Sequence, residues 1–221
     1  MSVQAPTADR SQMISGLAIG VATILALVFV AHHPIAAGQS HTEILNDIAQ
    51  KARTDRLVHG ALIGIMSGFL FGFSGFASGL GPYRALIRLG LVVYAAGCAS
   101  TAGAALIDGF IVPDIAARFL SAPADDSRIA YDFLCIAASA IQSLTKLGLV
   151  LLSAGILSWS VALVRFGGSR RWTGLLGLAA GGIQVLLILL AGEVMTPHSL
   201  IAILAVQGVW NLAVAVLLIR G

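Results

Sequence analysis

Charged side chains are scarce in this sequence. Only 10% of the 221 residues are Asp, Glu, Lys or Arg, whereas soluble domains average about 25%. A soluble fold with so few charges would lack a polar shell, but a fold surrounded by lipid does not need one. The formal net charge is +3 and no basic run occurs, so we expect no nucleic-acid partner.

Cysteine is scarce too, and the common motifs of soluble enzymes are absent. Cys98 and Cys135 are the only cysteines and lie far apart, which excludes a CxxC metal or redox motif. The chain has no Walker loop and no GxSxG motif, so nothing indicates ATP hydrolysis or a serine hydrolase. Its glycine patterns follow no predicted strand, which argues against dinucleotide binding.

Long apolar runs are what the sequence has in abundance. Each is about as long as the roughly 20 residues that a spanning helix needs. The runs cover residues 13–31, 57–80, 86–107, 133–164, 172–192 and 197–219. Irregular backbone cannot face lipid unsatisfied, so these runs should be helices. We therefore predict an all-α polytopic membrane protein, with residues 1–221 forming one six-helix transmembrane domain.

Two local patterns refine this prediction. The first run is longer than the apolar part of a signal peptide, so we expect it to be a retained span. In the second run, Gly68, Gly72 and Gly75 lie on one helical face. Glycines in this arrangement let two membrane helices approach closely, so this face should contact another helix.

The distribution of arginine predicts the orientation. Arg84, Arg165, Arg170 and Arg171 lie in short loops that, with six spans, share one side with Arg10 and Arg220. Positive charge in short loops is typical of the cytoplasmic side. We therefore expect both termini in the cytoplasm, in a plasma membrane of the bacterial inner-membrane type.

Two longer loops, residues 32–55 and 108–128, fall on the opposite, outer side. Each contains a short amphipathic segment, "SHTEILNDIAQKA" in the first and "IVPDIAARFL" in the second. We predict two short helices there, resting on the membrane surface or on the bundle. The segment "DGFIVP" at 108–113 should end the preceding helix, because it combines glycine with proline.

All five histidines fall on this predicted outer side, together with several carboxylates. Imidazole and carboxylate are the ligands of zinc, copper and iron sites. The candidate metal ligands are His33, His59, His198, Asp108 and Glu193. Asp55 precedes His59 by one helical turn, so its carboxylate would orient the histidine ring. His59 and His198 are the best pair for an axially ligated haem b, since both lie just inside predicted helices.

Several polar side chains within the runs complete the candidate pocket. Residues 147–164 carry no charge and would rise about 27 Å as a helix, which favours an interfacial position for Lys146 over a buried one. Its expected partner is Asp108 or Glu193, and Gln142 lies near the same level. Gln207 and Asn211 share one face of the last run, where amides either link helices or line a cavity.

The leading hypothesis is a membrane protein with an outward-facing His/carboxylate pocket that binds a transition metal or haem. One alternative is a small-solute or lipid transporter, supported by the glycine-rich helices and the intramembrane amides. Another is an accessory or structural subunit, because longer outer loops collect histidines by chance. Metal-assisted hydrolysis with Glu193 as base leaves an enzyme open as well. Expected partners are the lipid bilayer, a small-molecule ligand, and an oligomer or partner membrane subunit.

Overall fold

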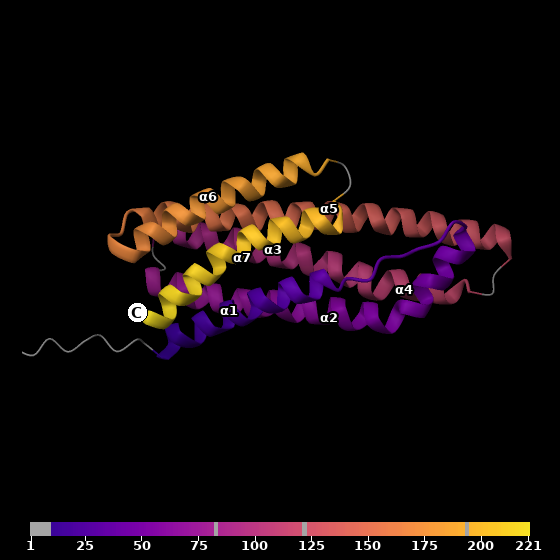
Figure 1. Cartoon of the computed structure of the whole chain (residues 1–221), viewed down its shortest axis with the longest axis horizontal. Helices are drawn as coiled ribbons and strands as arrows, with labels where there is room; N and C mark the ends of the chain where they lie inside the picture. The colour runs from indigo at the N-terminus through magenta and orange to yellow at the C-terminus, as the bar shows by residue number, and fades with distance from the viewer. Residues whose placement is uncertain (1–9, 82–83, 121–122, 193–194) are drawn as a thin grey trace, which may run out of the picture.

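The computed structural model describes residues 10–81, 84–120, 123–192 and 195–221, and all the regular structure in these ranges is helical. The elements are α1 (Arg10–Ala31), α2 (His41–Leu80), α3 (Ala85–Leu106), a π-helical turn η1 (Ile107–Ile111), α4 (Val112–Arg118), α5 (Ala124–Val164), α6 (Gly168–Leu190) and α7 (Pro197–Arg220). They run side by side along one long axis (Figure 1). By length and composition, six helices suit a membrane span, α3, η1 and α4 counting as one.

Two helices are longer than predicted. The α2 helix has 40 residues and α5 has 41, so each rises about 60 Å, twice the thickness of a hydrocarbon core. With α4, they extend past the other helices at the right-hand end of Figure 1. The short helix predicted in residues 32–55 is therefore not separate. It is the first part of α2, because no helix-breaking residue lies between His41 and Leu57.

The start of α2 is fixed by a cap and a small second core. The backbone N–H of Glu43 donates to Oγ of Ser40 at 3.2 Å, which satisfies one of the free amides of the first turn. The residues buried in this second core are Leu45, Ile48, Ala116, Ala130 and Leu134. The apolar face of this segment was predicted to rest on the membrane surface or on the bundle. In the structure it packs on other helices.

The segment "DGFIVP" does not end a helix, contrary to prediction. The chain passes from α3 through η1 into α4 without interruption. Pro113 lacks a backbone N–H, and its ring clashes with the carbonyl four residues earlier in a regular helix. The π-helical turn removes this conflict by widening the backbone, so that the N–H of Val112 donates to the carbonyl of Ile107.

The predicted glycine face of α2 packs closely on α1. A Cβ atom on Gly72 would lie 2.5 Å from Cγ1 of Ile19, and one on Gly75 would lie 2.0 Å from Oγ of Ser15. Any larger side chain would force the two helices apart. The expectation that this face contacts another helix is confirmed, and this contact holds α1 against the bundle.

An aromatic cluster fills the half of the bundle nearer the chain termini. The ring of Phe73 stacks on Trp159 and on Trp210, with ring centres 5.1 and 5.5 Å apart. Both tryptophans are fully buried, and each indole N–H donates to a backbone carbonyl on another helix, Ile87 for Trp159 and Thr173 for Trp210. This cluster joins α2, α5 and α7, and both of its indole N–H groups are hydrogen-bonded.

The arginine-bearing turns meet at the end of the bundle that holds the termini. The guanidinium groups of Arg84 and Arg170 lie 4.7 and 5.3 Å from the ring centre of Phe166. These cation–π contacts bring the α2–α3 and α5–α6 connections together. At the opposite end, two basic residues are paired with acids, in the Lys51–Asp47 and Arg56–Asp114 ion pairs.

Candidate metal site

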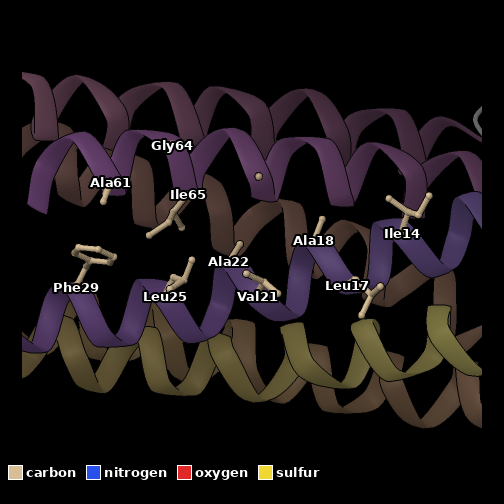
Figure 2. A pocket seen from close by; sticks show the side chains of 11 residues that line it. Ile14, Leu17, Ala18, Val21, Ala22, Leu25, Phe29, Ala61, Gly64 and Ile65 are labelled. Atoms are coloured by element: carbon tan, nitrogen blue, oxygen red, sulfur yellow. The ribbon is translucent and has the colours of Figure 1, made fainter. Parts of the chain in front are cut away.

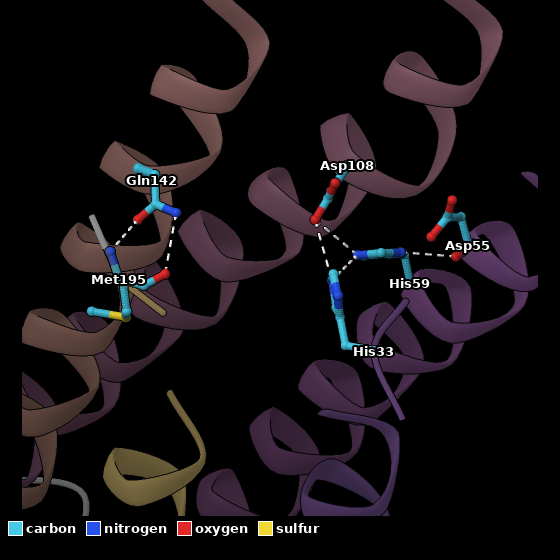
Figure 3. Close-up of polar contacts among 6 residues, drawn as sticks. All are labelled: His33, Asp55, His59, Asp108, Gln142 and Met195. Atoms are coloured by element: carbon cyan, nitrogen blue, oxygen red, sulfur yellow. Dashed lines mark hydrogen bonds and ion pairs between the residues drawn. The ribbon is translucent and has the colours of Figure 1, made fainter. Parts of the chain in front are cut away.

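Three of the predicted ligands meet at one point. Nε2 of His33 lies 3.0 Å from Nε2 of His59 and 3.3 Å from Oδ2 of Asp108, and the latter two atoms are 3.1 Å apart. The three side chains point toward one another (Figure 3). Among the described residues, this is the cluster of His, Cys, Asp and Glu side chains suited to a metal ion.

Each ligand comes from a different part of the fold. His33 follows the end of α1. His59 lies in the middle of α2, where its side chain is only 2% exposed. Asp108 is the second residue of η1, and its side chain is 29% exposed. Single π turns occur frequently at functional sites, and this one carries one of the three candidate ligands.

Gly109 allows η1 to approach α2. A Cβ atom at this position would lie 2.3 Å from Cβ of His59 and 2.7 Å from its Cγ. Real Cβ atoms essentially never come so close. The glycine next to Asp108 is therefore required for the aspartate to reach the histidine. Sequence reasoning did not single out Gly109, although the Asp-Gly pair ahead of a proline was a signal of unusual backbone there.

The orientation of the His59 ring is fixed by its other nitrogen. Nδ1 of His59 lies 2.8 Å from the backbone carbonyl oxygen of Asp55. A carbonyl only accepts, so Nδ1 carries the proton, and Nε2 of the neutral ring presents its lone pair to the cluster. The prediction that Asp55 orients this ring is correct in position but wrong in the atom, because the partner is the carbonyl and not the carboxylate.

The spacing of the three atoms matches a metal coordination shell. Ligands about 2.0–2.1 Å from a tetrahedral ion are about 3.3 Å apart, and adjacent ligands of an octahedral ion at the same distance are about 3.0 Å apart. The observed edges of 3.0, 3.1 and 3.3 Å lie in this range. Two imidazoles and one carboxylate occur in catalytic zinc sites and in ferrous sites that keep open positions.

A cavity of about 500 Å³ extends from this cluster into the bundle. His33, His59 and Asp108 line one part of it, and the remaining wall comes from α1, α2, α3, α5 and α7 and from the connections after α1 and before α7. Most of that wall is apolar. A volume of this size is typical of small-molecule sites.

A second hollow lies between α1 and α2 (Figure 2). It is lined by small and aliphatic side chains such as Ala18, Val21 and Gly64 and by the ring of Phe29. No ionisable side chain lines it, so it offers no group for chemistry.

Gln142, which lines the cavity, and Lys146 both bond to the backbone of the α6–α7 connection. The amide of Gln142 bonds the backbone of Met195 twice, accepting from its N–H at 2.9 Å and donating to its carbonyl at 3.4 Å (Figure 3). Nζ of Lys146 donates to the carbonyl of Gly192 at 2.6 Å. The predicted partner Glu193 lies outside the described residues.

The other predicted pocket residues are distributed differently. Gln207 is buried at the inner part of the cavity and accepts a 2.8 Å hydrogen bond from Nε2 of Gln184. Asn211 is buried one turn further, and among the described residues its Oδ1 has no hydrogen-bond partner. His198 is exposed at the start of α7 and belongs neither to the cluster nor to the cavity wall.

The fold and the cluster thus define an all-helical chain with six potential membrane spans and a two-histidine, one-aspartate site. Comparisons of this chain with protein-family models, with curated proteins and with solved structures found no match. The function must therefore be argued from the site itself.

Proposed function

We propose that this chain is a multi-pass membrane protein that binds one divalent transition metal ion through His33, His59 and Asp108. The observation that carries the proposal is the triangle of three donor atoms with edges of 3.0–3.3 Å. Zinc and ferrous iron suit this nitrogen and oxygen set best, since copper(I) prefers sulfur and magnesium prefers oxygen.

The proton positions support a cation at this point. With Nδ1 of His59 as the donor to Asp55, its Nε2 faces the Asp108 carboxylate as a second acceptor at 3.1 Å. Two acceptors in contact repel each other. A single N–H at Nε2 of His33 can donate to only one of them at a time. A metal ion bound by all three atoms removes the repulsion. A second proton on His59 would also do so, and measuring the metal content distinguishes the two explanations.

The depth of the site follows from helix lengths. The α1 and α3 helices have 22 residues each and rise about 33 Å, close to the thickness of a hydrocarbon core. His33 and Asp108 come just after their ends. We infer that the cluster lies at one membrane boundary, on the side opposite the Arg84 and Arg170 turns. The distribution of arginine favours the outer side for the cluster and the cytoplasm for both termini.

Binding of an ion is better supported than transport of an ion through the bundle. The cavity reaches Gln207 on α7, and Trp210 of the aromatic cluster lies one turn further along the same helix. Stacked rings therefore fill the next layer of the bundle. This arrangement favours a site that is reached from one side.

Metal analysis of the protein purified in detergent tests the proposal. We expect about one zinc or iron per chain, and the His59→Gln and Asp108→Asn variants should lose it. His32→Gln is the matched control, because His32 is exposed, adjacent to His33, and places its Nδ1 2.8 Å from the carbonyl of Val28 in α1. His198→Gln should also keep the metal. The proposal is wrong if wild-type protein fails to hold a stoichiometric ion after incubation with zinc, cobalt and ferrous iron.

A further inference from the structure

The cavity beside the proposed metal site has one polar end and a long apolar wall. Beyond the cluster, the wall is formed largely by aliphatic side chains, among them Leu62, Met66, Leu149 and Leu204. On α7 the wall runs from Pro197 to Gln207, which corresponds to about 15 Å along the helix axis. The cavity is therefore an elongated apolar space that begins at the three donor atoms.

Thr101, Gln142 and Gln207, three other polar residues of the wall, already bond to protein partners. Oγ1 of Thr101 donates to the carbonyl of Gly97, and Oε1 of Gln207 accepts from Gln184. The amide of Gln142 uses both of its atoms on Met195. A ligand with polar groups along its whole length would gain little here and would leave those groups unpaired.

We propose that this cavity binds a single-chain amphiphile, with a carboxylate head at the open position of the metal ion and its hydrocarbon chain in the apolar space. This inference rests on the proposed metal site. A divalent ion and the Asp108 carboxylate leave one net positive charge in the cluster, and a carboxylate head neutralises it. The aliphatic wall then buries the chain.

The volume sets the length of the chain. At about 30 Å³ for each water-sized group, the cavity of about 500 Å³ holds roughly 17 such groups. The axial length of about 15 Å accommodates roughly 12 bonds of an extended chain, at about 1.2 Å per bond, and so about 13 carbons. The two figures bracket a fatty acid of about 13–17 carbons, and myristic acid lies between them.

Cobalt substitution provides a direct test, because the visible absorption of cobalt(II) changes when a new oxygen ligand binds. The cobalt-loaded protein in detergent is titrated with myristate. The variant Leu204→Trp fills the cavity at a position away from the metal ligands. Val209→Trp is the matched control, since Val209 lies on the same helix but is 55% exposed on its outer face. Acetate serves as the head group without a chain.

We expect myristate to shift the cobalt spectrum of wild type and of Val209→Trp. Its affinity for Leu204→Trp should be at least about tenfold lower than for wild type, a difference equal to the burial of about two methylene groups. Acetate should bind weakly and equally to all three proteins. Equal myristate affinity in Leu204→Trp and wild type, or no spectral shift, overturns this inference while cobalt binding still supports the metal site. Failure to bind cobalt, zinc and ferrous iron alike overturns both the metal site and this inference.

Discussion

Gly109 is the position where one added methyl group should separate the two halves of the candidate site. In Gly109→Ala the new Cβ would lie 2.3 Å from Cβ of His59, whereas ordinary contacts begin at 3.4 Å. The π turn must therefore withdraw by about 1.1 Å, which is 3.4 minus 2.3. A withdrawal in the same direction would stretch the 3.1 Å contact between Asp108 and His59 to about 4.2 Å. Metal ligands tolerate only about 0.2 Å.

The expected result is a weaker metal site in a folded protein. Misplacing a supporting group typically costs about 10–100-fold in metal affinity, and the overpacked contact should lower the free energy of unfolding by about 1–3 kcal/mol. Affinity is measured by competition with a chromogenic chelator, and stability by thermal unfolding in detergent.

Gly103→Ala is the matched control on the neighbouring helix α3. Its Cβ would lie 3.7 Å from Cδ1 of Leu144, an ordinary contact. Alanine is favoured over glycine by about 0.5–1 kcal/mol inside a helix. This variant should therefore keep its metal affinity and unfold at the same or a higher temperature. Wild-type metal affinity in Gly109→Ala would refute the argument that the glycine sets the spacing of the site.

Three further predictions follow from the polar contacts. Metal occupancy at a fixed free-metal concentration should fall as the pH is lowered, because His33 and His59 must be unprotonated to bind an ion; unchanged occupancy in acid would point to other ligands. Gln184→Leu removes the donor to Gln207 and should lower the free energy of unfolding by about 0.6–1.7 kcal/mol, which thermal unfolding checks and an unchanged midpoint would contradict. Gln142→Leu removes both hydrogen bonds to Met195. The backbone amide of Met195 should therefore exchange with deuterium faster in this variant than in wild type.

The helical content and the number of potential spans could be predicted because they depend on local composition. Each apolar run had the length of a spanning helix, and the structure has a helix in each. The start of α7 is encoded locally, since Oγ1 of Thr196 accepts from the N–H of Ser199 and Pro197 is the first helical residue. Helix beginnings of this kind are encoded within four residues, so sequence alone suffices.

The site was only partly predictable because its geometry depends on contacts between distant segments. His33, His59 and Asp108 were among the candidate ligands, but nothing in the sequence separated them from His198. Which histidines meet Asp108 depends on η1, which arises from the conflict between Pro113 and a regular helix. It depends equally on Gly109, whose role is visible only once His59 lies opposite. Long-range packing of this kind leaves no periodic signal along the chain.

The aromatic cluster of Phe73, Trp159 and Trp210 fills the layer of the bundle beyond the cavity. An ion would therefore reach the candidate metal site from one end of the bundle only. Exchange would then occur from a single aqueous compartment. In sealed vesicles containing the protein in both orientations, a chelator that cannot cross lipid would strip only those molecules whose cluster faces it. The fraction of metal removed would equal the fraction of molecules in one orientation, without any label on the protein.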